Sequence, residues 1–310
     1  MGIKHTYTAT GTNDATKQVS LDRWNQDHVI DSALVLPAAA TVPPLAGNLA
    51  LYATDRGGRM MLAQMGPSGP DTTLQPSLGG SKIALWMPPG GSAAVPGVFG
   101  MNALTLVGTA TARAIATTGL LTRMTRLGVV SVATAAGFAS ATEAVAKYTA
   151  GAGGVLGGFH LRFRFAVSDP ATVAGARMFV GLSNSVAAAA NVEPNTLTNS
   201  VGLVKLSTSD NLHIYCAGAT AGTAIDLGVN FPGHTLSTDV YELSLFSAAS
   251  NGNISYRVER INTGHVAVGT ITTNLPTSAT LMCVRAWRTN NATLLAVALD
   301  LCGIYVETDY

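Results

Sequence analysis

A long series of short strands from about residue 97 onward constrains the fold of this chain more than any other feature. In the clearest of them, GFHLRFRFAVSD, apolar residues starting with Phe159 alternate with His160, Arg162 and Arg164. Because successive side chains of a strand point to opposite faces, this pattern predicts a strand that is buried on one face only. Similar segments follow, each bounded by Gly, Pro, Asn, Asp or Ser, without helices between them. The spacing predicts an antiparallel β-sandwich or jelly roll over residues 97–310.

The stretch 103–150 fits this series less clearly. It is rich in Ala, which favours a helix, but Thr and Val are frequent and three glycines interrupt it. The segment LGVVSVAT within it has the composition of a strand. We predict strands over this stretch, with a helix as the alternative and a helical turn at 141–149.

The first 96 residues divide into two segments. Residues 1–45 contain one helix-like patch, SLDRWNQDHVIDSAL, and the proline-rich segment LPAAATVPPLAG, a stiff extended connector, follows. Over 46–96 we predict a β-hairpin connector, in which apolar residues alternate on both sides of Gly57-Gly58. The two glycines supply the positive φ angles that a tight hairpin turn requires. One further strand, KIALWM, lies in the same segment.

The amino-acid composition limits the classes of function that this chain is expected to have. Only 11% of the residues are charged and the net charge is +1, which argues against nucleic-acid binding, because that function needs clustered Lys and Arg. The absence of 18 consecutive apolar residues excludes membrane insertion by a helix. Such a low charge is more typical of a subunit that buries part of its surface in an assembly. We interpret Cys216, Cys283 and Cys302, which lie in apolar contexts, as buried thiols.

Motifs for catalysis are lacking. The segment GAGGVLGG departs from the dinucleotide fingerprint, because Leu156 stands at its third glycine position. Glu242 and Glu259 are able to meet across a hairpin as a carboxylate pair, but their alternating strands favour two exposed charges. His160, on the polar face of its strand, is interpreted as a solvated side chain. We therefore predict a protein that is not an enzyme and that uses no metal or cofactor.

One segment has the composition of a sugar-binding site. In RAWRTNNAT, Trp287 stands beside Arg285, Arg288, Asn290 and Asn291 at the end of a strand. An aromatic ring stacks on a sugar face while Asn and Arg side chains bond its hydroxyls, so this segment is our candidate for glycan contact. The alternative places Trp287 in the core and the two Asn residues in a turn.

Several segments resemble structural proteins of tailed bacteriophages. YATDRGGRMMLAQMGPSGPDTTLQP, followed by GSKIALWMPPG, is similar to a connector of these proteins, and VSLDRWNQDHVI is similar to a segment that precedes it near their N-terminus. The C-terminal segments LSTDVYELSLF, INTGHVAVGTI, AWRTNNAT and LDLCGIYVETD are similar to the lectin-like heads of phage tail fibres and minor structural proteins. The resemblance implies a mainly β protein with an extended N-terminal anchor, a hairpin connector and a jelly-roll or concanavalin-like sandwich.

The resemblance also implies a location and partners. The chain is expected in the virion as a homotrimer, with its N-terminus on other tail or capsid proteins and its head turned outward. The hairpin then buries its apolar side only against neighbouring copies, since an isolated hairpin is marginal in water. The expected docking residues are Trp24, Asn25, Asp27, His28, Val29 and Ile30; a small local apolar cluster is the alternative interpretation.

Three functions remain open. The first is a tail fibre or receptor-binding protein that attaches to host-surface glycans. The second is a capsid decoration or head-fibre protein that needs no receptor. The third, which the lack of a carboxylate pair makes weakest, is a polysaccharide depolymerase.

Overall fold

The alternating segment at 159–167 forms a strand with one buried and one polar face, as the pattern predicts. In the computed structural model, which describes residues 49–56, 59–65, 71–73, 82–95, 99–152, 157–249 and 251–308, this segment is β9 (Phe159–Val167). Its inward side chains are at most 2% exposed, and these are Phe159, Leu161, Phe163 and Phe165. Its outward side chains, among them Arg162 and Arg164, face away from the core.

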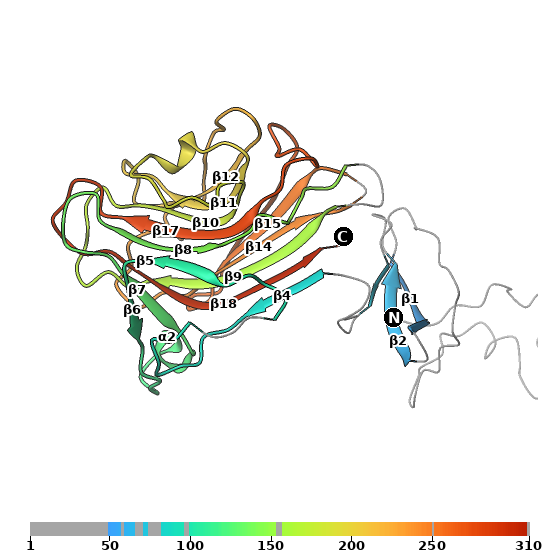
Figure 1. Ribbon diagram of the computed structural model, residues 1–310, viewed down its shortest axis with the longest axis horizontal. Helices are drawn as coiled ribbons and strands as arrows, with labels where there is room; N and C mark the ends of the chain where they lie inside the picture. The colour runs from blue at the N-terminus through green and yellow to red at the C-terminus, as the bar shows by residue number, and fades with distance from the viewer. Residues whose placement is uncertain are drawn as a thin grey trace, which may run out of the picture.

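β9 belongs to one of two large antiparallel sheets that pack face to face (Figure 1). The eight-stranded sheet contains, in spatial order, β16 (His265–Ile271), β15 (Ile254–Arg260), β14 (Tyr241–Ser247), β9, β18 (Ala298–Thr308), β7 (Leu127–Val130) and β6 (Thr109–Ala112), with β4 (Lys82–Trp86) pairing β18. The seven-stranded sheet contains β13 (Ile225–Asp226), β12 (Leu212–Ala217), β11 (Ser200–Lys205), β10 (Arg177–Ser183), β17 (Cys283–Thr289), β8 (Phe138–Glu143) and β5 (Leu104–Val107). The predicted antiparallel sandwich is confirmed.

The sandwich begins before residue 97, where the sequence had placed its boundary. Strand β4, which was assigned to the connector, pairs with β18 along its whole length. Its Ala84 and Trp86 lie in the core between the sheets, and Trp86 is fully buried. Burial of a large aromatic side chain therefore ties KIALWM to the sandwich.

Within 103–150 the prediction of strands is confirmed. The segment contains β5, β6, β7 and β8, and one short helix, α2 (Leu120–Arg123). The helical turn predicted at 141–149 is wrong, because β8 continues to Glu143 and Tyr148 then forms an isolated bridge with Met282. The hydrogen bonds to neighbouring strands outweigh the helical propensity of the alanines.

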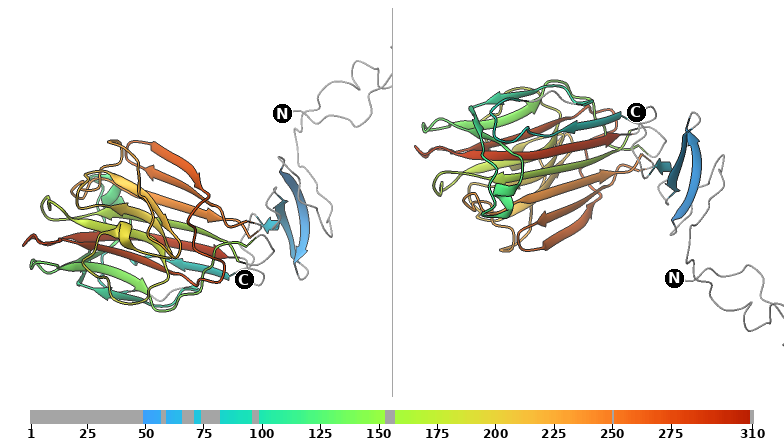
Figure 2. Two further views of the ribbon diagram at one scale, coloured as in Figure 1. Left: turned by 90° about the horizontal axis from the view of Figure 1, so that it is seen from above. Right: turned by 90° about the horizontal axis from the view of Figure 1, so that it is seen from below.

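The predicted hairpin is present. β1 (Ala50–Arg56) and β2 (Arg59–Met65) pair antiparallel, with Arg56 opposite Arg59, and β3 (Asp71–Thr73) adds a third strand. Figure 2 shows this small sheet (blue) as a separate unit beside the sandwich. On one of its faces Leu51 and Leu62 are exposed. The docking residues predicted within 1–45 lie outside the described part of the chain.

The outer faces of the two sheets differ. Loops cover much of the seven-stranded sheet, including the 3₁₀ turn η1 (Pro194–Thr196), and the hydroxyl of Tyr215 donates to the Asn195 carbonyl at 3.1 Å. An apolar cluster lies beneath these loops and contains Phe179, Val204, Tyr215, Ala217 and Trp287. The middle of the eight-stranded sheet instead presents charged side chains to the solvent.

The three cysteines are buried free thiols, as the sequence predicts. Burial raises the pKa of Cys216 and of Cys302 to about 12 and that of Cys283 to about 11. In the described ranges, no helix reaches the length and hydrophobicity that a membrane crossing requires.

Buried ion pairs connect strands with the loops between them. Arg288 and Asp169 are both fully buried, and Arg288 Nε lies 2.9 Å from Asp169 Oδ1. Asp300, also buried, accepts from Arg113 Nε at 2.9 Å and from Arg126 Nε at 3.0 Å. Loss of one member of a buried pair leaves a charge without compensation, which is far more costly than loss of an exposed pair.

Asp169→Ala is expected to lower the free energy of unfolding by about 3–5 kcal/mol, because the Arg288 guanidinium stays buried without its carboxylate. Urea unfolding monitored by fluorescence measures this change. Glu259→Gln, which breaks an exposed pair with Arg257 at 2.6 Å, is the control and is expected to cost less than about 1 kcal/mol. Equal losses in the two variants would contradict the prediction.

Candidate functional site

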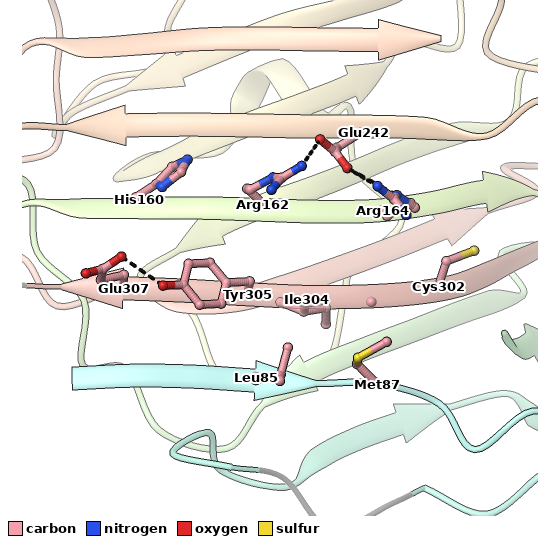
Figure 3. A pocket seen from close by; sticks show the side chains of 11 residues that line it. Leu85, Met87, His160, Arg162, Arg164, Glu242, Cys302, Ile304, Tyr305 and Glu307 are labelled. Atoms are coloured by element: carbon pink, nitrogen blue, oxygen red, sulfur yellow. Dashed lines mark hydrogen bonds and ion pairs between the residues drawn. The ribbon is translucent and has the colours of Figure 1, made fainter. Parts of the chain in front are cut away.

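The charged middle of the eight-stranded sheet contains an open pocket (Figure 3). Its volume is about 550 Å³, and four neighbouring strands, β4, β18, β9 and β14, supply most of its lining. The lining side chains combine an apolar edge with polar and charged groups, and the lining residues are Leu85, Met87, His160, Arg162, Arg164, Glu242, Cys302, Gly303, Ile304, Tyr305 and Glu307.

A β-bulge in β18 directs two of these residues into the pocket. Leu301 pairs with Phe165, but the next partner of β9 is Gly303, so Cys302 is one extra residue in β18. A shift of one residue transfers the following side chains to the opposite face of a sheet. Tyr305 and Glu307 consequently point outward instead of into the core.

Gly303 leaves open space at the base of the pocket, because it has no side chain. It stands opposite Arg164 in the sheet, where any other residue would project a side chain outward. A Cβ atom at Gly303 would meet nothing closer than the Trp86 carbonyl oxygen, at 3.9 Å. The space above Gly303 is thus open to a ligand and would also accept a larger side chain.

Two arginines hold one carboxylate at the β14 side of the pocket. Glu242 Oε1 accepts from Arg162 Nη2 at 2.6 Å, and Oε2 accepts from Arg164 Nε at 3.1 Å and Nη2 at 2.5 Å. Burial of Glu242 opposes its ionisation, but the hydrogen bonds and charges of the two guanidinium groups outweigh this effect and lower the pKa of Glu242. The carboxylate therefore remains ionised and fixes the position of both arginines.

An aromatic ring lies at the centre of the pocket. Tyr305 is the cross-strand partner of both Leu85 of β4 and Arg162 of β9. Figure 3 shows its ring lying flat over the strands, with one face toward the viewer. Its hydroxyl donates to Glu307 Oε2 at 2.8 Å. His160 packs edge-on against this ring, and burial is the main cause that lowers the pKa of His160. The pocket thus offers an aromatic ring with the Glu307 carboxylate at its hydroxyl and the Arg162 guanidinium on the adjacent strand.

Two side chains of the pocket differ from the sequence interpretation. Glu242 and Glu259 do face each other across β14 and β15, but Glu242 is 6% exposed instead of being a solvent-facing charge. His160 is half-buried between Tyr305 and Phe246 instead of being solvated. The sequence placed Arg162, Arg164 and His160 on one face of β9, but it carried no signal that Tyr305 lies beside them.

The segment predicted to contact glycan is mostly inaccessible. Trp287 is 1% exposed, Arg285 is 4% exposed, and Arg288 and Asn290 are fully buried; Asn291 is half-buried. The Trp287 ring stacks with Phe179 beneath the covering loops, at 6.5 Å between centroids. Asn290 and Thr293 are joined by a backbone hydrogen bond of 3.0 Å in the turn that follows. This arrangement matches the alternative interpretation, with Trp287 in the core, and does not fit contact with a sugar.

A second, smaller pocket lies beside the edge strands β13 and β16 of the two sheets. Its volume is about 300 Å³, and its lining includes Cys216, Thr223, Ile271 and Asn274. The Asn274 amide is already used within the protein, because its Oδ1 accepts from Gly218 N at 3.1 Å and its Nδ2 donates to two carbonyls. In the described residues, no three His, Cys, Asp or Glu side chains gather as a metal site would require.

Comparisons with known proteins give the following picture. No protein-family model and no curated protein matches the sequence. Among solved structures, the chain is similar to peanut lectin with a bound 9mer peptide, at 12% identity and a TM-score of 0.44, over 66% of this chain and 90% of the lectin. It is also similar to lectin II from Ulex europaeus, at 14% identity and a TM-score of 0.43, over 68% of this chain and 95% of the lectin.

A further similar structure is a protein of unknown function from Shewanella oneidensis MR-1, at 13% identity and a TM-score of 0.47, covering 76% of this chain and 90% of that one. At such identities and TM-scores, these likenesses carry no information about the function of this chain.

The lowered pKa of Glu242 predicts a pH dependence. A carboxylate with a depressed pKa stabilises the fold above the ordinary Glu value of 4.5, and this contribution disappears as the pH falls through the folded-state pKa. Glu242→Gln is expected to cost about 1 kcal/mol at pH 7, since the exposed arginines are rehydrated. Urea unfolding from pH 7 to pH 3 is expected to show the wild type converging on the variant at low pH. A difference that stays constant with pH would contradict the assignment.

Proposed function

We propose that this chain is a non-enzymatic attachment protein of a bacteriophage, and that its sandwich binds a host-surface glycan in the pocket on the eight-stranded sheet. The observation that carries the proposal is the ring of Tyr305, which has Glu307 at its hydroxyl and Arg162 beside it on the neighbouring strand β9. A sugar places its apolar face on such a ring, while charged groups at the ring edge bond its hydroxyls.

The buried carboxylate of the pocket, Glu242, favours binding over hydrolysis. A glycosidase needs a carboxylic acid with a raised pKa to protonate the leaving group. The pKa of Glu242 is lowered instead, and the oxygens of Glu242 are occupied by Arg162 and Arg164. Held in this way, Glu242 positions the arginines and is unsuited to act as a general acid.

The phage setting of the proposal rests on the resemblance of the connector and C-terminal segments to virion proteins. Attachment would then be multivalent, because copies fixed on one particle raise the effective concentration of the next contact to the millimolar range. A shallow, open pocket of weak affinity suffices under these conditions. A capsid decoration protein remains the alternative, and a receptor-free role predicts that the isolated protein does not compete with phage adsorption.

Tyr305→Ala is expected to lower the affinity for a bound oligosaccharide by about tenfold, which corresponds to ~1.4 kcal/mol, because the stacking surface is lost. A glycan array identifies the ligand and isothermal titration calorimetry measures the affinity. Tyr305→Phe keeps the ring but loses the bond to Glu307 and is expected to retain most of the binding. Unchanged affinity in Tyr305→Ala would overturn the proposed pocket.

A second variant blocks the pocket without removing a functional group. Gly303→Leu places a side chain in the open space above β18, where even the Cβ atom meets little. Binding is expected to be lost while the thermal unfolding temperature stays within a few degrees of the wild type. Release of reducing ends from the same oligosaccharide by the wild-type protein would instead favour the depolymerase.

The exposed leucines of the hairpin predict an assembly of copies. Leu51 is 53% and Leu62 is 41% exposed on one face of this sheet, and the neighbouring copies of a trimer would cover them. Light scattering is expected to give about three times the chain mass of 31.7 kDa, and Leu51→Asp with Leu62→Asp is expected to lower it to that of a monomer. A monomeric wild-type protein would contradict this prediction.

A further inference from the structure

The arginine end of the pocket carries more positive charge than the protein compensates. Among the residues that the structure describes, Arg162 and Arg164 share the single carboxylate of Glu242, so one of the two positive charges has no ion-pair partner of its own at this end. Tyr305 separates this end from Glu307, the other carboxylate of the pocket, which stands opposite His160. The pocket is therefore polar along its length, with a basic side at Arg162 and Arg164 of β9 and an acidic side at Glu307 near the end of β18.

The guanidinium groups remain accessible although they are fixed in place. The side chains of Arg162 and Arg164 are 50% and 41% exposed, whereas that of Glu242 is 8% exposed beneath them. Within the described residues, Arg162 bonds to the protein only through Nη2, which leaves Nη1 and Nε as donors for a ligand. A buried carboxylate thus holds two exposed cationic groups in fixed positions, which lowers the entropic cost of using them.

The position of Arg162 relative to Tyr305 indicates which ligand group it would meet. The two residues are direct cross-strand partners, and partners of this kind lie about 4.5–5.5 Å apart at their Cβ atoms. A sugar ring stacked on Tyr305 would then place a substituent on its rim within reach of the Arg162 guanidinium. A carboxylate matches the planar fork of arginine better than a hydroxyl does, because it accepts two parallel hydrogen bonds with an opposite charge.

We propose that the glycan taken by this pocket is acidic, and that a hexuronate unit stacks on Tyr305 with its carboxylate on Arg162. This inference rests on the proposed function, since it specifies the ligand of the same pocket. Glu307 fixes the orientation of the ligand in the pocket, because it repels the ligand carboxylate and accepts hydrogen bonds from the sugar hydroxyls on its side. The paired charges of Arg164 and Glu242 keep Arg162 in place whether or not the pocket is filled.

The test compares acidic oligosaccharides with neutral ones of the same backbone. Oligomers of galacturonate, glucuronate, mannuronate and guluronate are titrated into the full chain beside their methyl esters, which remove the charge and change the shape little. At least one acid is expected to bind about tenfold or more tighter than its ester, and this advantage is expected to fall as salt is raised from 20 to 500 mM.

Arg162→Gln separates this inference from a general effect of charge. The variant is expected to lose the advantage of the acid over its ester while still binding the ester, because the Tyr305 ring remains. Arg257→Gln is the matched control: Arg257 lies on the same sheet but does not line the pocket, so the full advantage is expected to remain. Circular dichroism and thermal unfolding confirm that both variants fold.

The outcomes distinguish the two proposals. If neutral oligosaccharides bind in a Tyr305-dependent way and no acid exceeds its ester, the acidic ligand is overturned and the glycan-binding pocket stands. A preference for hexose phosphates over every hexuronate would also overturn the carboxylate. If neither acids nor neutral glycans bind, the proposed function fails together with this inference.

Discussion

The two faces of β18 face the core and the pocket, and a single extra residue decides what each face contains. Before the bulge, Leu299 and Leu301 face the core, and after it Ile304 and Val306 do so. Cys302 is the extra residue at which the alternation of inward and outward side chains shifts by one position. Tyr305 and Glu307 therefore point to the outer face, beside Arg162 and His160. Without the extra residue, a tyrosine and a glutamate would point between the sheets, where an unpaired charge is strongly unfavourable. The core and the pocket are therefore specified by one local irregularity.

The two outer faces of the sandwich have different chemistry for a related reason. The seven-stranded sheet carries large apolar side chains outward, such as Phe179 and Trp287, and loops cover them. The eight-stranded sheet carries arginines and glutamates outward in its middle, which need no cover because water and one another satisfy them. The open pocket thus lies on the eight-stranded sheet, while the aromatic residue that first suggests a sugar site, Trp287, is buried beneath the other sheet's loops.

Sequence reasoning succeeded where a pattern is local. The alternation around Phe163 predicted the buried face of β9, the Gly57-Gly58 pair predicted the connection between β1 and β2, and the apolar contexts of the cysteines predicted buried thiols. It failed where the environment of a segment depends on contacts with residues far away in the sequence. The segment RAWRTNNAT has the composition of a glycan site, but it can contact a glycan only if Trp287 is exposed. Whether a loop about a hundred residues earlier in the chain covers Trp287 cannot be read from any local pattern. KIALWM was likewise assigned to the connector, because its partner strand lies more than two hundred residues away.

The sequence by itself determined the class of the fold and, for a strand with clear alternation such as β9, which residues lie on each face, since side-chain alternation follows directly from backbone geometry. In β18, two residues instead of one separate the inward-facing Leu301 and Ile304, and this break in the alternation marks the bulge. Only the tertiary structure decided that β4, β18, β9 and β14 lie side by side, and hence that Tyr305 meets Arg162 and that Glu242 is clamped by two arginines. The physical reason is that strand order depends on long-range pairing, in which the free energy comes from burying a shared core and not from any one segment.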